Sequence, residues 1–221
     1  LVVSGSHLSK KFGNTKKELL KEKYKIVATI RNLVVHDDYA ARLTSASNQL
    51  TKLIKVVKKE QPDFIIAPYD REESITAALV GAYMHIPVVH LGAGDRTRFN
   101  IDGVIRHSVT KLSNLFFCST KKSAERVIKL GEEKWRVFHV GSTAGDRYKT
   151  VKNLSLSYLS KYLKLDIGKE PLLVFIQHPV SNWLSKTKKH IKVSLSSIDE
   201  LNMPTVVIRS NSDPGTIAIK S

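Results

Sequence analysis

Short apolar runs, separated by helical segments, limit the folds open to this chain more than any other feature of its sequence. Several of the runs are apolar at consecutive positions, so both faces of the strands they form must be buried. The runs are Leu1 to Ser4, Phe64 to Ala67, Pro87 to Leu91, Leu115 to Cys118, Val137 to Val140, Leu172 to Gln177 and Thr205 to Arg209. Parallel strands with helices on both faces meet this demand, and the chain is predicted to be α/β and doubly wound.

Helices are predicted between these strands. Apolar residues recur at helical spacing at Ile75, Ala78, Leu79 and Ala82, and again at Ile105, Val109 and Leu112. A third helix is expected to begin after Thr120 and to end at Leu130, with Gly131 in the C-terminal capping position.

A basic stretch rich in Ser and Leu, from Lys149 to Lys169, separates two blocks of strands and helices. We therefore expect one domain over residues 1–150 and a second over residues 151–221. The second block is small for an independent core, and the chain begins on a strand without Met. We expect a chain that is truncated at both ends.

The net charge is +16, from 36 Lys and Arg residues against 20 Asp and Glu. Such a charge attracts polyanions, either nucleic acid or a phosphorylated small molecule. The lysines occur in short clusters that are typical of solvated faces: Lys10-Lys11, Lys16-Lys17, Lys58-Lys59, Lys121-Lys122, and the group Lys186, Lys188 and Lys189. Aromatic residues, which single-stranded nucleic acid would stack on, are largely absent from these clusters. Nucleic acid is therefore the minor alternative among the partners, and it predicts salt-sensitive binding to arbitrary duplex DNA.

The single cysteine, Cys118, lies in an apolar run, which predicts a buried thiol and excludes an internal disulfide. A reducing compartment fits this cysteine usage. The sequence has neither an apolar run of membrane-spanning length nor a signal-peptide pattern, so we expect a cytoplasmic protein with no membrane partner. The histidines are dispersed, and no metal site, P-loop or Gly-x-Ser-x-Gly elbow is predicted.

Polar residues follow three of the predicted strands, and ligands of open α/β sheets bind beyond such strand ends. The first group contains Asp70, Arg71 and Glu73. The spacing of Asp70 and Glu73 matches a capping box. The same helix start offers free N–H groups and a positive dipole end, to which Arg71 adds charge, so a phosphate or a reacting carboxylate would suit it.

The second group lies in HLGAGDRTRFNIDGVIRHS, which contains His90, Gly92, Gly94, Asp102, Arg106 and His107. The glycines permit close backbone approach, but a third glycine and an immediate helix are missing from the dinucleotide fingerprint. Asp102 fits a helix N-cap with Arg106 one turn on, and also a functional carboxylate. His107 taken alone fits a structural role.

The third group is Ile176-Gln177-His178-Pro179, where a histidine follows an apolar strand. Alone, His178 fits a structural role, but it would face the same crevice as the other groups if the two blocks are paired Rossmann-like domains. The three groups together favour a cleft enzyme, or a binding protein, for an anionic and nucleotide-linked ligand.

The order HLxxGDR, IDGVIRHSVTKLS, FFCSTxxSAERVIKLGE and WRVFHVGS resembles the UDP-N-acetylglucosamine 2-epimerases. The segment RHSVTKLS resembles more closely their hydrolysing branch, which makes N-acetylmannosamine and UDP for sialic-acid-type sugars. LVVSGSHLSKKFGNT resembles the family's second strand and the following loop, and IQHPV and RSNSDPG resemble the start of its second domain. The resemblance implies two Rossmann-like domains of GT-B-like fold, a nucleotide sugar in their cleft, dimers or tetramers, and no metal or redox cofactor. It also implies a further strand before Leu1 and more of the nucleotide-binding domain after Ser221.

The reaction implied by the resemblance removes the sugar C2 proton while UDP leaves C1, and water then adds to the 2-acetamidoglucal. Positioned carboxylates suit the proton transfers, and cations with N–H groups suit the departing diphosphate. The positions carried over as catalytic are Asp70, Asp102 and His178, with Arg71 and Arg106 for phosphate binding or for orienting the acids. Asn211, Ser212 and Asp213 are placed near the nucleotide, and His90, Gly92, Gly94 and His107 are expected to line the substrate.

Two departures from the family pattern affect the predicted site. Tyr69 stands in the place of the glycine of the family's Gly-Asp-Arg motif, and many relatives have a glutamate where this chain has Gly92. Either Asp95 supplies the missing acid–base group or the proton transfers differ. A non-hydrolysing epimerase, which returns UDP-N-acetylmannosamine, and an inactive nucleotide-sugar binder are the alternatives.

Overall fold

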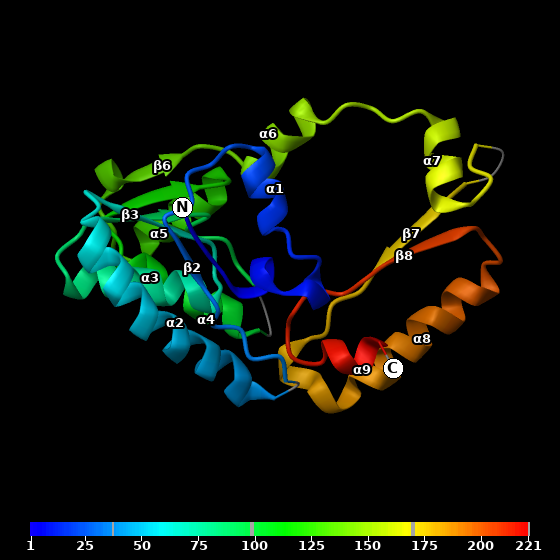
Figure 1. The fold of residues 1–221 in the computed structure, drawn as a ribbon, viewed down its shortest axis with the longest axis horizontal. Helices are drawn as coiled ribbons and strands as arrows, with labels where there is room; N and C mark the ends of the chain where they lie inside the picture. Colours follow the sequence, from blue (N-terminus) through cyan, green and yellow to red (C-terminus); the bar gives the residue numbers. More distant parts are fainter. Residues whose placement is uncertain (37, 98–99, 169–170, 221) are drawn as a thin grey trace. The chain divides into compact units, whose positions relative to one another are not determined.

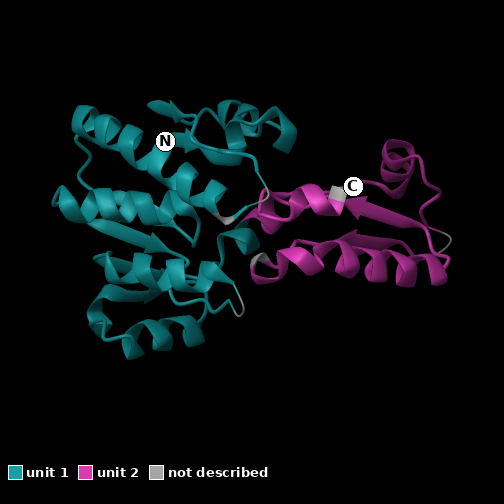
Figure 2. Ribbon diagram, turned by 90° about the horizontal axis from the view of Figure 1, so that it is seen from below, with its two compact units in different colours: residues 1–146 teal, residues 147–221 magenta. Residues whose placement is uncertain are grey.

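The computed structural model describes residues 1–36, 38–97, 100–168 and 171–220. The chain forms two compact units, Leu1–Asp146 and Arg147–Ser221 (Figure 2). Lys169, which ends the stretch where the sequence predicts a domain boundary, lies outside the described residues, as does Ser221.

The main sheet of the first unit is parallel, and its strands follow one another in sequence order (Figure 1). The strands are β3 (Ile65–Pro68), β4 (Val88–Leu91), β5 (Leu115–Cys118) and β6 (Val137–His139). The helices that follow them are α3 (Glu72–Tyr83), α4 (Ile101–Lys111), α5 (Lys121–Lys129) and, after the 3₁₀ helix Lys134–Arg136 and β6, α6 (Thr143–Thr150). The strands predicted here are confirmed to within a residue at each end, and their carboxyl ends share one edge of the sheet.

A second, two-stranded parallel sheet in this unit pairs β1 (Val2–Ser4) with β2 (Ala28–Ile30). Between them lie the 3₁₀ helices Gly5–Leu8 and Lys10–Phe12 and the helix α1 (Lys16–Lys21), and the long helix α2 (Tyr39–Glu60) follows β2. The sequence analysis missed both β2 and α2. Asp38 caps α2, because its side chain accepts a hydrogen bond of 2.7 Å from the Ala41 backbone N–H.

Three apolar clusters form the core of the first unit. Ile30, Leu53, Val57 and Val80 join α2 to α3; Ala67, Ala78, Val88 and Val109 join α3 and α4 to the sheet; and Ala93, Phe116, Cys118 and Val127 join α5 to the sheet. The predicted burial of Cys118 is confirmed, and burial raises the pKa of its thiol to about 11. The thiol is therefore protonated at neutral pH and a poor nucleophile.

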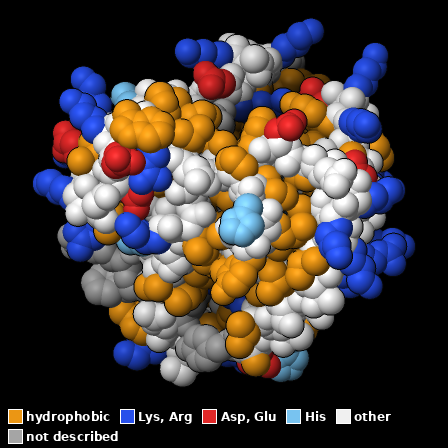
Figure 3. Space-filling view, turned by 90° about the vertical axis from the view of Figure 1, so that its left-hand side faces the viewer, with side chains coloured by type: hydrophobic (Ala, Val, Ile, Leu, Met, Phe, Trp, Pro, Cys, Tyr) orange, Lys and Arg blue, Asp and Glu red, His pale blue; other side chains and the backbone are white. Residues whose placement is uncertain are grey.

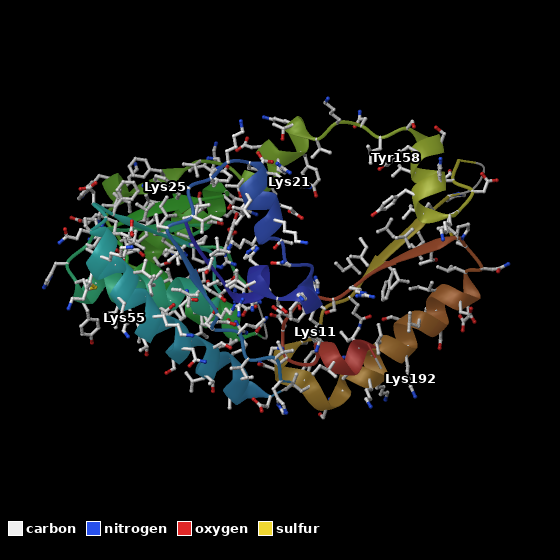
Figure 4. The ribbon with its side chains drawn as sticks, viewed as in Figure 1. Lys11, Lys21, Lys25, Lys55, Tyr158 and Lys192 are labelled. Carbon is white, nitrogen blue, oxygen red and sulfur yellow. The ribbon has the colours of Figure 1, made fainter. Side chains whose placement is uncertain are left out.

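The surface carries the excess of positive charge. On the face shown in Figure 3, hydrophobic side chains gather toward the middle, and Lys and Arg side chains surround them. The lysines labelled in Figure 4 come from different elements and are all exposed: Lys11, Lys21, Lys25, Lys55 and Lys192. The lysines of the predicted clusters are exposed as well, apart from the half-buried Lys16, which confirms the prediction of solvated clusters.

The second unit is built on the parallel pair β7 (Leu173–Ile176) and β8 (Thr205–Ile208). Its helices are α7 (Leu156–Leu163), the 3₁₀ helix Ser181–Lys186, α8 (Thr187–Glu200) and α9 (Thr216–Lys220). Both strands were predicted. Across the described part of the chain, no helix combines the length and the apolar character needed to cross a bilayer.

Candidate functional site

Most of the predicted site residues of the first unit gather where β3 and β4 end. Asp70 and Arg71 follow β3, His90 lies within β4, and the turn after β4 holds Gly92, Gly94 and Asp95. Asp102, Arg106 and His107 lie on α4, which packs beside α3 (Figure 1). The carboxyl edge of the sheet is where α/β proteins bind their ligands.

The buried guanidinium of Arg106 connects Asp70, which follows β3, with the turn after β4, which contains Asp95. Arg106, which is 7% exposed, donates from Nη2 to the Asp70 carboxylate. Its Nη1 donates to the carbonyl of Gly92 at 2.8 Å and lies 3.6 Å from a carboxylate oxygen of Asp95. Arg106 therefore fixes Asp70 relative to Asp95, which is 36% exposed in its side chain.

The predicted capping box of Asp70 and Glu73 is wrong. The N-cap residue of α3 is Arg71, and no side-chain cap hydrogen bond forms there. The Asp70 carboxylate instead pairs with Arg106 from α4. A charge-assisted bond to a buried guanidinium is stronger than a bond to a backbone N–H, so the tertiary partner wins.

Asp102 also has a guanidinium of its own. Its Oδ1 accepts from Nη1 of Arg42 at 3.1 Å, and its Oδ2 accepts from Nδ2 of Asn100 at 2.5 Å. The predicted N-cap role of Asp102 is wrong, because the N-cap residue of α4 is Asn100. Asp102 lies instead within the first turn, where the helix dipole favours a negative charge.

The carboxylate of Glu72, at the start of α3, lies between the guanidinium groups of Arg42 and Arg71. Nε and Nη2 of Arg42 donate to one carboxylate oxygen of Glu72 at 3.1 and 2.9 Å, and Nη2 of Arg71 donates to the other at 3.2 Å. Burial, together with the neighbouring Glu72, raises the pKa of Glu73, and Arg71 opposes this shift. Arg42 was not predicted, because the helix α2 that carries it was not predicted. Glu72 was given no role, because its partner Arg42 lies 30 positions away in the sequence.

His90 is buried and connects the backbone at Tyr69 with Thr110 on α4. Its ring is 0% exposed, its Nε2 lies 2.9 Å from the carbonyl oxygen of Tyr69, and its Nδ1 lies 3.1 Å from Oγ1 of Thr110. Burial lowers the pKa of His90 to about 4, so the ring is neutral at physiological pH. A fully buried ring has no surface for a ligand, which corrects the predicted substrate contact of His90.

The two glycines of the turn allow other parts of the protein to approach closely, and their place in the lining of the substrate site stays a prediction. A Cβ on Gly92 (φ +78°) would lie 2.5 Å from Cδ1 of Tyr69, and a Cβ on Gly94 (φ +77°) would meet the backbone oxygen of Ser123 in α5. The Tyr69 ring therefore occupies the space beside Gly92. Its hydroxyl lies 2.6 Å from Oγ1 of Thr143 at the start of α6.

Helix α5 holds the same turn from the other side. Oγ of Ser123 donates to Oδ1 of Asp95 at 2.5 Å, and Nη1 of Arg126 donates to the carbonyl of Gly94. Ser123 therefore holds one carboxylate oxygen of Asp95, and the other oxygen lies toward Arg106. Asp95 is the residue predicted to supply the acid–base group that is absent at Gly92.

His107 lies among cations. Burial comes first, and the nearby Arg126, Arg106 and Arg96 add to it, in lowering the pKa of His107. Within the described ranges, its buried Nδ1 has no hydrogen-bond partner. A neutral, half-buried imidazole in a cationic setting suits contact with an anionic or hydroxyl-bearing ligand, and this role stays a prediction.

The predicted residues of the second unit form a group of their own, where β7 and β8 end. Nδ1 of His178 accepts from the backbone N–H of Asn211 at 3.2 Å and lies 3.4 Å from Oγ of Ser210. Asn211 and Asp213 bond each other at 2.6 and 3.0 Å, and Ser212 lies between them in the turn. Because Nδ1 accepts from a backbone amide, the proton of the neutral ring is on Nε2.

Comparison with known proteins assigns a family to this arrangement. A family model described as UDP-N-acetylglucosamine 2-epimerase matches residues 1–221. The chain belongs to the UDP-N-acetylglucosamine 2-epimerase family. The expectation drawn from the HLxxGDR and RHSVTKLS segments is thereby confirmed at the level of the family.

Curated relatives of this epimerase-family chain include hydrolysing enzymes. The chain is 36% identical to the GDP/UDP-N,N'-diacetylbacillosamine 2-epimerase (hydrolyzing) of Campylobacter jejuni, over 99% of this chain and 57% of the relative. It is 27% identical to the UDP-N,N'-diacetylbacillosamine 2-epimerase (hydrolyzing) of Legionella pneumophila, over 97% of this chain and 56% of the relative. The chain therefore spans a little over half the length of these relatives.

Solved structures show the same fold. The UDP-N-acetylglucosamine 2-epimerase of Rickettsia bellii matches with a TM-score of 0.69 and 18% identity, over 100% of this chain and 56% of that one. The enzyme of Neisseria meningitidis, solved with bound UDP-N-acetylglucosamine, matches with a TM-score of 0.68 and 16% identity, over 99% and 68%. The chain has the α/β, GT-B-like fold of these epimerases, with parallel sheets flanked by helices.

Proposed function

We propose that the protein is a hydrolysing 2-epimerase that converts UDP-N-acetylglucosamine to N-acetylmannosamine and UDP. One observation carries the proposal. Two carboxylates at the carboxyl edge of one sheet, Asp70 and Asp102, are each held by a separate guanidinium, of the buried Arg106 and of the partly buried Arg42. A reaction that removes one proton and delivers another needs two such groups in fixed positions.

In the proposed reaction a carboxylate takes the C2 proton, and the electron pair of the C2–H bond forms the C1–C2 double bond. The C1–O bond breaks, and its electron pair leaves with UDP. Water then adds its hydroxyl at C1 and gives its proton to a second carboxylate, while a carboxylic acid delivers a proton to C2. We assign removal of the C2 proton to Asp102, delivery of the final proton to Asp70, and acceptance of the proton of the water to Asp95.

Cations and N–H donors suit the departing diphosphate, whose charge grows as the bond breaks. In the first unit, Arg71 at the start of α3 is the group proposed for this purpose. In the second unit, which we propose to be the start of the nucleotide-binding domain, His178 is proposed to donate its Nε2 proton to a phosphate oxygen. Asn211, Ser212 and Asp213 are proposed to contact the nucleotide.

UDP-N,N'-diacetylbacillosamine is the second candidate substrate. The observation that favours it is that relatives with 36% and 27% identity carry this sugar in their names. Both candidates are UDP-linked 2-acetamido sugars, so the same proton transfer and elimination apply to either. A preference between them depends on contacts at C4 and C6 of the sugar.

The test is NMR of the protein with each UDP-sugar in deuterated water, following the sugar C2 proton and the release of UDP together. The proposal predicts a free 2-acetamido sugar of manno configuration with deuterium at C2, and loss of this product in Asp70→Asn. A UDP-linked epimer as the product would establish the non-hydrolysing reaction. Saturable broadening of UDP signals without any product would establish an inactive binder.

A further inference from the structure

Arg42, on α2, connects the first turns of α3 and α4. We propose that Arg42 is a positioning residue, which holds the Asp102 carboxylate in place for removal of the C2 proton. The proposal rests on the proposed function, because the proton transfer belongs to Asp102. In this scheme Arg42 contacts no substrate atom and acts only through the Asp102 carboxylate.

The geometry of the guanidinium sets its direction. Two of its nitrogens, Nε and Nη2, donate to the same carboxylate oxygen of Glu72, and the third nitrogen, Nη1, donates to Asp102. A guanidinium is planar and rigid, so two bonds to one acceptor fix the direction of the third donor. Glu72 is thus the anchor that points Arg42 at Asp102.

Burial distinguishes the two carboxylates that Arg42 joins. The side chain of Glu72 is 4% exposed, that of Arg42 is 13% exposed and that of Asp102 is 19% exposed. The carboxylate at the Glu72 end is closed to solvent, whereas the carboxylate at the Asp102 end can be reached. The buried Glu72 fixes Arg42, and Arg42 in turn holds the accessible carboxylate of Asp102. Reacting groups in binding and catalytic sites are commonly held by such second-layer contacts.

A second triad of charges in the same unit has its buried carboxylate in the middle. Glu132 is paired with Lys111 at 2.6 Å and with Arg136 at 2.9 Å. There the carboxylate lies in the middle and is 6% exposed, while the cations at the ends are 56% and 21% exposed. Arg136 also pairs with the exposed Glu133 at 3.3 Å. We call Lys111, Glu132 and Arg136 the Glu132 triad; it lies where β6 begins, away from the carboxyl ends of the strands, and serves as a matched control.

A kinetic double-mutant cycle tests the proposal. Arg42→Gln is expected to lower kcat by roughly ten- to a hundredfold, the range for loss of a bond to a charged group, while KM changes by less than about threefold. In an Asp102→Asn background the same substitution is expected to cause no further loss, because Arg42 acts through Asp102. Arg42→Lys, which keeps the charge but cannot reproduce the fork, is expected to recover only part of kcat.

Arg136→Gln, in the Glu132 triad, controls for the general cost of breaking a buried ion pair. It is expected to lower the melting temperature but to leave kcat unchanged. Equal losses of kcat for Arg42→Gln with and without Asp102 would overturn the proposal, as would a loss confined to KM. If Arg42→Gln fails to fold, Arg42→Lys and its double variant with Asp102→Asn complete the cycle.

A second measurement keeps this proposal separate from the proposed function. The ¹³C carboxyl signal of Asp102, assigned by its loss in Asp102→Asn, is expected to shift in Arg42→Lys and to stay in place in Arg136→Lys. Absence of turnover by the wild type would refute the proposed function, and the carboxyl signal then decides alone. An unmoved Asp102 signal in Arg42→Lys would overturn the positioning role in either case.

Discussion

Protonation of His90 should destabilise the first unit within a defined pH range. The pKa of His90 lies at about 4 in the folded chain, against 6.5 for an unperturbed histidine. Burial of a ring that is 0% exposed causes the difference. Between the two values the unfolded chain binds a proton at this ring and the folded chain does not.

Proton linkage gives the direction and the size of the change in the free energy of unfolding with pH. Between pH 6.5 and about 4 the unfolded chain binds a proton at His90 and the folded chain does not, and a falling pH favours the state that binds more protons. The free energy of unfolding is therefore highest above pH 6.5 and decreases as the pH falls toward about 4. Each pKa unit corresponds to about 1.4 kcal/mol, so the free energy of unfolding should decrease by about 3 kcal/mol across this range. For a unit with an ordinary stability of ~5–15 kcal/mol, that is a substantial part of the total.

The assay is urea unfolding at pH values from 7.5 to 4.5, followed by the fluorescence of Trp135. Trp183→Phe in every variant removes the signal of the second unit. His90→Gln is the control, because its amide can donate to the Tyr69 carbonyl and does not titrate. Burial raises the pKa of Glu73, so the contribution of Glu73 to the free energy of unfolding decreases as the pH rises. This contribution is the same in the wild type and in His90→Gln. If wild type and His90→Gln lose stability in parallel as the pH falls, the reasoning about His90 is refuted.

Three further outcomes are expected. Gly92→Ala should destabilise the first unit by roughly 1–3 kcal/mol, and Tyr69→Gly in the same chain should relieve much of this cost, because the new methyl would lie 2.5 Å from the Tyr69 ring. Gly94→Ala should cost at least as much in thermal denaturation, and Tyr69→Gly should give no relief, because its obstacle is the backbone of α5. His178→Gln should bind UDP by calorimetry nearly as tightly as the wild type, whereas His178→Asn, which has no donor at the Nε2 position, should bind about tenfold more weakly; equal affinities would remove the Nε2 donor from nucleotide binding.

The strands other than β2 could be predicted from their runs of consecutive apolar residues, α3 and α4 from apolar residues at helical spacing, and α5 from Thr120 and Gly131 at its two ends. The helix α2 could not. Its buried face mixes Leu53 and Val57 with the buried polar residues Ser45 and Gln49, so the apolar stripe is interrupted at the positions where a helical period would reveal it.

The candidate site was predictable where its residues are close in sequence and hidden where they are not. Asp70 and Asp102 were found because each follows a strand or opens a helix. Arg42 lies 60 positions from Asp102, and no local pattern joins them. The capping box at Asp70 failed for the same reason, because its guanidinium partner is 36 positions away.

The hold of α5 on the turn after β4 has a consequence for how this protein tolerates change. Ser123 and Arg126 bind the turn, and the helix itself is seated on the sheet by Val127, which is fully buried. The position of the Asp95 carboxylate therefore depends on the packing of α5, which carries none of the predicted site residues. Substitutions at Ser123, Arg126 or Val127 are expected to displace Asp95, whereas substitutions of the exposed Lys121 and Lys122 are not.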